Sequence, residues 1–175
     1  MGFPTTRSQK TSSALVIAEG HGRAGLMRSV VQRVTTASVI VDGQEIGRIG
    51  TGLLALIGIA VDDGSETADV LADKIVDLRI FEDAQGKMNR SLLDVSGQLL
   101  LVSQFTLLGD TRRGKRPSFT QAMEPAGAEV LFQRVCTRAR DRGVSVATGR
   151  FRADMKVMLV NDGPVTILLD TAKTF

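Results

Sequence analysis

A short, wholly apolar run in the middle of the chain is the feature that most limits its fold. The run Leu99–Val102 follows Gly97 and has the length of a strand that is covered on both faces. Four residues, three of them polar, stand where the run ends: Ser103, Gln104, Phe105 and Thr106. Four cations follow within five positions: Arg112, Arg113, Lys115 and Arg116. A hydrogen-bonding pocket beside a cationic loop indicates an anionic ligand, although a core strand that runs into a solvated charged turn has the same pattern.

Apolar residues elsewhere alternate or run together in the manner of strands. Strands are predicted at 30–41, 44–49, 53–61, 98–107, 144–147, 155–160 and 165–169. Asp42-Gly43 predicts a hairpin turn, Asn161–Pro164 a second turn between strands, and residues 82–96 a loop.

Two segments repeat their apolar residues at helical spacing. One is 66–79, with Ser65 as its N-cap; the other begins at Pro125, ends at Gly143 and carries an arginine-rich outer face. Many strands with two main helices place the chain in the α+β class. We expect residues 27–175 to form one compact, barrel-like domain of mostly antiparallel sheet.

Residues 1–26 differ from the rest of the chain. They are rich in Ser, Thr and Gly without sustained periodicity, which predicts a disordered extension; a transit peptide and a vector-derived or upstream start are the alternatives. Three of the 22 basic residues and one of the 19 acidic residues lie here, which leaves 19 basic against 18 acidic residues in 27–175. Any contact of this near-neutral body with nucleic acid must therefore come from a local patch.

The residue inventory excludes several chemistries. The only histidine, His21, lies in the extension, so the body holds no Ser-His-Asp or Cys-His arrangement and no metal site is expected. The single cysteine, Cys136, allows no internal disulfide and is predicted to be a core residue. No apolar run approaches the ~18 residues that a membrane span needs, and we expect a cytoplasmic protein with no membrane partner.

Two phosphate-binding patterns occur but are incomplete. Gly109–Lys115 matches G-x-x-x-x-G-K, yet Arg116 stands where Ser or Thr should hold magnesium. Val165–Asp170 imitates the second strand of such a site, so a small P-loop-like phosphohydrolase stays open as an alternative. Gly50–Ala55 matches a dinucleotide fingerprint but continues as a strand where a helix is required.

Three stretches, in order and in register, resemble the D-aminoacyl-tRNA deacylase family: RSVVQRV at 28–34, SQFT at 103–106 and NDGPVT at 161–166. The resemblance covers Met27 to about Asp170. It implies a homodimeric hydrolase that needs no cofactor and cleaves the ester between a D-amino acid and the tRNA 3′ end. The resemblance also implies action on glycyl-tRNA mischarged on tRNA-Ala and rejection of L-aminoacyl-tRNA.

The same resemblance assigns roles to residues. The segment Ser103–Thr106 is implied to line the pocket, with Thr106, Phe105, Gln104 and Ser103 as its catalytic residues. Gly163-Pro164 is implied to be a cis dipeptide that one subunit lends to the other's pocket as a chiral filter, and Arg33 to hold it in place. Glycine allows close backbone approach and an X-Pro bond readily becomes cis, although an ordinary turn fits the same residues.

Without a histidine in the body, the expected mechanism relies on the backbone and the substrate. Backbone N–H groups around Phe105 and Thr106 are expected to stabilise the oxyanion, and the ribose 2′-hydroxyl to assist. The cations of 112–116 are expected to contact phosphates at the tRNA acceptor end, with no DNA partner. A non-catalytic RNA-binding module remains the other alternative.

Overall fold

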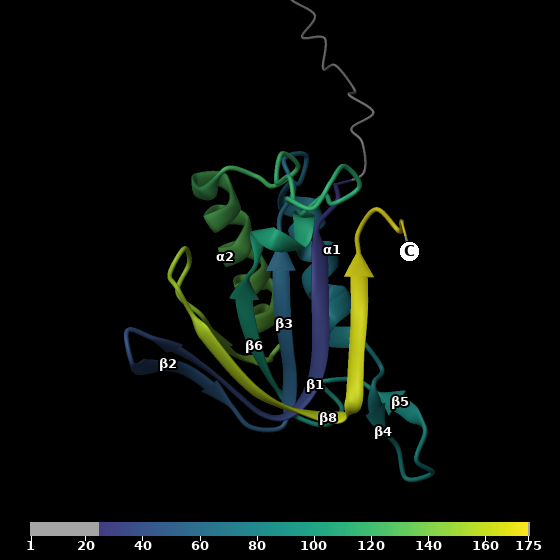
Figure 1. The fold of residues 1–175 in the computed structure, drawn as a ribbon. Coiled ribbons are helices and arrows are strands. Elements are labelled where there is room, and N and C mark those ends of the chain that lie inside the picture. Colours follow the sequence, from purple (N-terminus) through teal and green to yellow (C-terminus); the bar gives the residue numbers. More distant parts are fainter. Residues whose placement is uncertain (1–24, 175) are drawn as a thin grey trace, which may run out of the picture.

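The computed structural model describes residues 25–174 (Figure 1). Nearly all of the predicted N-terminal extension, His21 included, therefore lies outside the described residues. Gly25 already belongs to the folded body, because its carbonyl accepts a hydrogen bond from the Thr171 hydroxyl (2.5 Å). The same hydroxyl accepts a bond from the Met27 N–H (3.0 Å), and the Met27 side chain is fully buried.

The long strand β1 (Arg28–Val41) lies at the centre of the sheet and has three antiparallel partners. β3 (Gly52–Gly58) pairs with the first half of β1, β2 (Gln44–Ile49) with the second half, and β8 (Lys156–Asp170) along the other edge. Asp42 and Gly43 join β1 to β2 with φ of 50° and 78°, the positive values that a two-residue hairpin turn requires. The predicted hairpin is confirmed.

The remaining strands of this sheet pair in parallel. β6 (Gln98–Ser103) pairs with β3 on one side and with β7 (Ser145–Thr148) on the other. The sheet curves strongly (Figure 1), and a Cβ on Gly47 of β2 would lie 2.8 Å from the Thr148 carbonyl oxygen of β7. Because β2 thus returns to the far edge, the sheet is nearly closed, which confirms the predicted α+β, barrel-like class.

Both long helices cover the same face of the sheet (Figure 1). α1 (Ser65–Asp77) and α2 (Pro125–Asp141) bury Leu71, Ile75 and Phe132 against it. β6 contributes Leu99 and Leu101 to this core and turns Leu100 and Val102 into a second cluster on the other face of the sheet. The prediction of a strand covered on both faces is confirmed. Within residues 25–174, no helix combines the length and apolar character needed to cross a membrane.

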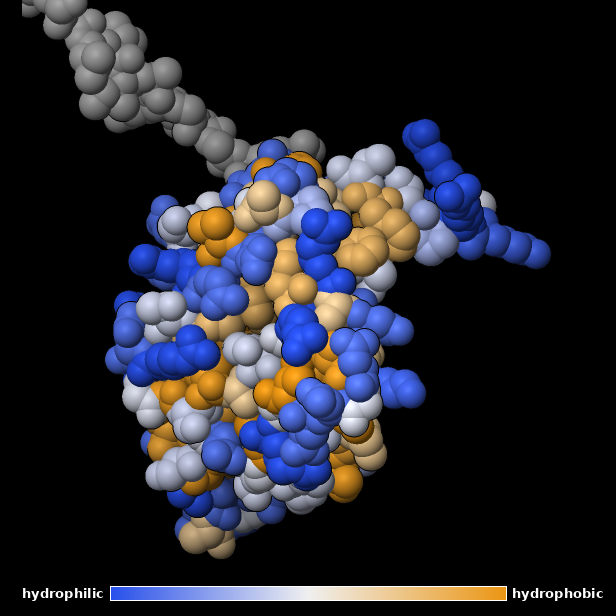
Figure 2. Space-filling view, turned by 90° about the vertical axis from the view of Figure 1, so that its left-hand side faces the viewer, coloured by the Kyte–Doolittle hydropathy of each residue, from blue (hydrophilic) through white to orange (hydrophobic). Residues whose placement is uncertain are grey.

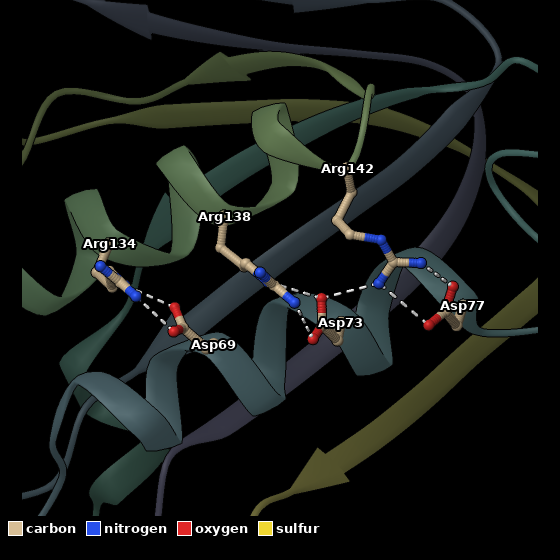
Figure 3. A network of polar contacts seen from close by, with 6 residues as sticks. All are labelled: Asp69, Asp73, Asp77, Arg134, Arg138 and Arg142. Atoms are coloured by element: carbon tan, nitrogen blue, oxygen red, sulfur yellow. Dashed lines mark hydrogen bonds and ion pairs between the residues drawn. The ribbon is translucent and has the colours of Figure 1, made fainter.

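The arginine-rich face of α2 is not simply a solvated outer face. Two of its arginines and its C-cap residue Arg142 form a ladder of ion pairs with α1 (Figure 3). The N–O distances are 2.6 to 2.8 Å: Arg134 with Asp69, Arg138 with Asp73, and Arg142 with both Asp73 and Asp77. The ladder forms because each helix carries its charges four residues apart and the two helices lie side by side. Sequence periodicity located the charges but not their partners.

Several predicted boundaries are wrong. The two strands predicted at 155–160 and 165–169 are one strand, β8, and Asn161–Pro164 forms a bulge within it rather than a turn. β6 ends at Ser103 instead of continuing to 107, because Phe105–Leu108 forms a short 3-10 helix, η1. β3 ends at Gly58 rather than at residue 61.

Two smaller predictions also fail. The predicted loop 82–96 contains part of a small hairpin, β4 (Phe81–Glu82) and β5 (Met88–Arg90), whose turn is held by the Asp83 carboxylate. The N-cap of α1 is Gly64, and Ser65 is the first helical residue. In both places several neighbouring polar residues could form the local hydrogen bonds, and the sequence does not show which of them does.

Candidate functional site

A cavity of about 640 Å³ opens at the edge where the parallel strands β3, β6 and β7 end. Each strand brings residues to it: Ile57 and Ile59 from β3 and beyond, Ser103–Phe105 from the end of β6, and residues 151–155 from the loop after β7. The start of α2 closes one side with Met123 and Pro125. Carboxyl ends of parallel strands meet at one edge of a sheet, which is where such sheets usually bind ligands.

Backbone hydrogen bonds fix the Ser103–Thr106 segment at the cavity. The Gln104 N–H donates to the Ile57 carbonyl of β3 (2.7 Å), and η1 begins with the bond from the Leu107 N–H to the Gln104 carbonyl (3.2 Å). The N–H groups of Phe105 and Thr106 come before this bond, so the helix gives them no acceptor. The Gln104 side-chain amide donates to the Thr106 hydroxyl. Thr106 is exposed, and it is the one residue of this segment that does not line the cavity.

An exposed aromatic pair stands at the cavity. Phe105 of η1 and Phe119, both lining residues, meet edge to face with ring centroids 5.0 Å apart. The two residues are 57% and 36% exposed, unusually high for phenylalanine. Their accessible apolar surface is therefore available to a ligand at the cavity mouth.

Arg33 and the Gly163-Pro164 pair lie together at the bulge of β8. Arg33 is the one residue of β1 that faces the four residues 162–165, and the Gly163-Pro164 peptide bond is cis. The buried Arg33 guanidinium donates to the carbonyls of Asp162 (3.1 Å) and Ile80 (2.6 Å), and its Nε lies 3.3 Å from the Asp162 carboxylate. A Cβ on Gly163 would lie 3.3 Å from Arg33 Nη2. The arginine thus anchors the bulge from one side.

The bulge does not reach the cavity within one chain. Arg28, at the start of β1, donates to the Leu107 carbonyl of η1 (3.1 Å), whereas Arg33 contacts the bulge five residues further along the same strand. A strand rises ~3.3 Å per residue, so the two places are about 17 Å apart along β1. The structure brings Arg33 to Gly163-Pro164 and Ser103–Phe105 to the cavity, but it does not bring these two groups together.

The basic loop, residues 110–118, is closed at its base by backbone hydrogen bonds and contains one ion pair. Backbone bonds in both directions (2.8 and 2.9 Å) join Asp110 to Ser118. The Arg112 guanidinium binds the Asp110 carboxylate through two hydrogen bonds (2.9 and 2.6 Å) and, with the Arg112 N–H, holds the pKa of that carboxyl well below its usual range. The charge of Arg112 is therefore already compensated.

The other cations of the loop are exposed. Arg113, Lys115 and Arg116 form no ion pair among the described residues. Arg113 also lines a second cavity of about 450 Å³, together with Asp110, Arg112, Ser118 and Thr120. In Figure 1 the loop lies at the top of the molecule, and Figure 2, turned by 90°, shows at the upper right a lobe that ends in hydrophilic side chains. Three of the four predicted cations thus remain free to meet an anion.

Sequence reasoning missed the part of the site that comes from residues 151–155. Phe151, Arg152 and Asp154 line the main cavity, but locally they resemble any loop between two strands. Only the parallel pairing of β6 with β7 reveals that this loop ends at the same edge as Ser103.

Burial raises the pKa of Cys136 to about 11, so its thiol is inert, as expected of a core residue. Residues 25–174 contain no cluster of metal-ligating side chains.

Comparison with known proteins identifies the family. Residues 30–170 match the family described as D-Tyr-tRNA(Tyr) deacylase. The chain is 58% identical over 149 residues to the D-aminoacyl-tRNA deacylase of Anaeromyxobacter dehalogenans and 56% identical to that of Thermotoga petrophila; each match covers 85% of this chain and all of the relative. The chain therefore belongs to the D-aminoacyl-tRNA deacylase family, a family of hydrolases.

Solved structures agree with this fold. One, titled "c-Myc DNA Unwinding Element Binding Protein", is 41% identical and superposes with a TM-score of 0.77 over 81% of this chain and 97% of its own. Another, titled as a probable eukaryotic D-amino acid tRNA deacylase, is 19% identical with a TM-score of 0.72, over 83% and 99% of the two chains.

The P-loop alternative fails. In a P-loop the helix begins directly at the lysine, whereas here residues 116–124 separate Lys115 from the start of α2.

Proposed function

We propose that the chain hydrolyses the ester between a D-amino acid and the 3′ end of tRNA, and that it cleaves glycyl-tRNA mischarged on tRNA-Ala but spares L-aminoacyl-tRNA. Family membership gives the reaction class. The observation that carries the proposal is the cavity at the ends of β3, β6 and β7, lined by Ser103–Phe105 and followed along the chain by a basic loop. An aminoacyl group fits the cavity while its tRNA extends over the cations.

The chemistry we propose uses positioned backbone groups. Water attacks the ester carbonyl carbon, the bond to the ribose oxygen breaks, and a proton passes to that oxygen, which yields a free amino acid and tRNA. The N–H groups of Phe105 and Thr106 stabilise the oxyanion, and the ribose 2′-hydroxyl assists. The Thr106 hydroxyl is a poor base, so Thr106→Ala should retain turnover of D-aminoacyl-tRNA. A loss of kcat with unchanged tRNA binding would refute this backbone mechanism.

We propose a homodimer because the site is incomplete in one chain. Gly163-Pro164 is exposed on β8, about 17 Å along β1 from η1. β8 is a long edge strand that, within the described residues, pairs only with β1, and it exposes Met158, Val160 and Leu168, each at least 55% accessible. Native proteins cover such edges and apolar stripes. A second copy placed over β8 would cover them and carry its own dipeptide to the cavity.

In this arrangement the dipeptide of the partner copy rejects L-aminoacyl-tRNA. Rigid main chain at Gly163-Pro164 leaves space on one side of the α-carbon for a hydrogen but not for a side chain, so only glycine and D-amino acids fit. The buried Arg33 keeps the dipeptide in place through the Asp162 carbonyl. Selectivity then needs no side chain of the dipeptide at all.

We propose tRNA, and not DNA, as the nucleic-acid partner of the basic loop, in the cytoplasm. One solved relative is named for DNA binding, so a DNA duplex belongs among the controls. The body of this chain is near neutral, with three free cations concentrated on one loop. Such a small positive patch suits the few phosphates at one tRNA acceptor end better than the many phosphates along a DNA duplex.

The experiment that tests the proposal is release of amino acid from matched D-, L- and glycyl-tRNA by the full chain, with and without EDTA. We expect hydrolysis of the D and glycyl esters, sparing of the L ester and no effect of EDTA. Binding of tRNA without hydrolysis would leave the RNA-binding module as the function. Equal cleavage of D and L esters would refute the role of Gly163-Pro164, and tighter binding of duplex DNA than of tRNA would refute the choice of partner.

A further inference from the structure

We propose that Arg28 is a positioning residue for the hydrolysis reaction, because together with Gly58 it forms a seat that holds η1. This inference rests on the proposed function, since η1 carries Phe105 and Thr106, whose N–H groups we assign to the oxyanion. Arg28 and Gly58 are cross-strand partners in the β1–β3 ladder, and both touch η1. Neither residue lines the main cavity.

Arg28 holds the C-terminal end of the 3-10 helix. Its Nη1 donates to the Leu107 carbonyl at 3.1 Å. Carbonyls in the last turn of a helix have no donor within the helix, and a cation at that end interacts favourably with the helix dipole. The contact spans 79 residues of sequence, so it ties η1 to the centre of the sheet.

The other side of η1 packs against Gly58, whose lack of a side chain allows the close approach. A Cβ at this position would lie 2.5 Å from Leu108 Cδ2, 2.9 Å from Leu107 Cβ and 3.1 Å from the Gln104 carbonyl oxygen. η1 therefore packs directly on the backbone of β3. The adjacent bond from the Gln104 N–H to the Ile57 carbonyl (2.7 Å) fixes the point where the chain enters η1.

Loss of the Arg28 side chain should affect the position of η1 more than the free energy of unfolding. Its Nε is buried and has no hydrogen-bond partner among the described residues, which is a cost that the folded state carries. Loss of the side chain removes this cost together with the Leu107 bond, so the net effect on unfolding is small. The effect on the site is larger, because a displacement of about 1 Å in a reacting group can reduce a rate ~100-fold.

The test compares kcat and KM for D-aminoacyl-tRNA in Arg28→Met, Arg28→Lys and Gly58→Ala, with Arg48→Met as the control. Methionine keeps the length and apolar stem but has no donor, lysine keeps a cationic donor, and Arg48 is exposed on β2, does not line the cavity and does not contact η1. We expect R28M to lower kcat about 10-fold or more with KM changed less than about 2-fold, because the basic loop is intact. R28K should recover part of kcat, G58A should lose it, and R48M should match the wild type.

Each outcome decides the question. Wild-type kcat in a folded R28M overturns the inference. A fall in kcat that is fully explained by a smaller folded fraction, as urea unfolding measures it, overturns it as well. If R28M does not fold, G58A decides: wild-type kcat in that variant excludes a seat at β3. A change confined to KM assigns Arg28 to substrate contact and also overturns the inference. If the wild-type chain itself hydrolyses no D-aminoacyl-tRNA, the proposed function fails, which is a different result from an active enzyme that is indifferent to Arg28.

Discussion

Replacing Arg113, Lys115 and Arg116 together by glutamine should make tRNA binding much less dependent on salt, while removing the Asp110–Arg112 pair should not. The structure supplies the reason: three cations are exposed and form no ion pair with any part of residues 25–174, whereas the Arg112 guanidinium is held by Asp110 at 2.6 and 2.9 Å. Each phosphate contact contributes a slope of about −0.7 to −0.9 to log K against log salt. Loss of three contacts should therefore flatten the slope by about 2 to 3.

The matched control is the charge-neutral double variant Asp110→Asn/Arg112→Gln. Single replacement of Arg112 would uncover the Asp110 carboxylate and so change the net charge of the loop. The assay is the Kd of uncharged tRNA for the full chain between 50 and 200 mM salt, where three contacts correspond to about a 20- to 40-fold change in affinity. If the double variant flattens the slope as much as the triple variant does, Arg112 contacts phosphate and the ion pair does not neutralise it.

Three further predictions concern stability. Arg33→Leu should destabilise the fold by about 2–4 kcal/mol, because it leaves the Ile80 and Asp162 carbonyls without their buried donor, and Arg33→Lys by less; urea unfolding measures both, and equal values would refute the argument. Burial raises the pKa of Asp63 to about 6, so its charged form disfavours folding, and this penalty grows as pH rises from about 4 through 6. Asp63→Asn should therefore be more stable than the wild type by up to about 2–3 kcal/mol at pH 7.5 and by less at pH 5, and a difference independent of pH would contradict this. Arg134 and Arg138 hold the pKa values of Asp69 and Asp73 below their usual range, so the ladder stabilises the fold above pH ~4, and this contribution is lost as pH falls through the lowered values. Asp73→Asn should flatten the acid limb of thermal unfolding between pH 5 and 2.5, and 1 M salt should have a similar effect on the wild type.

The sequence located much of the site because the signals there are local. Gly97 and the apolar run after it mark a buried strand, and the following polar residues mark its end. Both faces of that strand are indeed covered, by two separate clusters. The motifs around Arg33, Ser103 and Gly163 carried the family assignment, which the comparisons confirm. The absence of histidine after His21 already left no Ser-His-Asp or Cys-His arrangement in the body.

Other features depend on which segments pair, and no local pattern contains that information. Residues 155–169 look like two strands around a turn, because Asn-Asp-Gly-Pro is a turn signal; pairing of both halves with β1 makes them one strand with a bulge. Likewise, the cavity needs the ends of β3, β6 and β7 at one edge, and so the contribution of Phe151 and Arg152 is invisible in the sequence.

The sequence by itself determined the two long helices and most of the strands, the α+β class, the family and the identity of the polar and cationic residues at the site. Periodicity, composition and short motifs each depend on a few neighbouring residues, so these features can be predicted without knowing which segments pair. Only the tertiary structure decided which charges are used internally: Arg112 by Asp110, and the arginines of α2 by the aspartates of α1. It also decided that Gly163-Pro164 lies far along β1 from the cavity, because strand register and helix packing join residues distant in the chain.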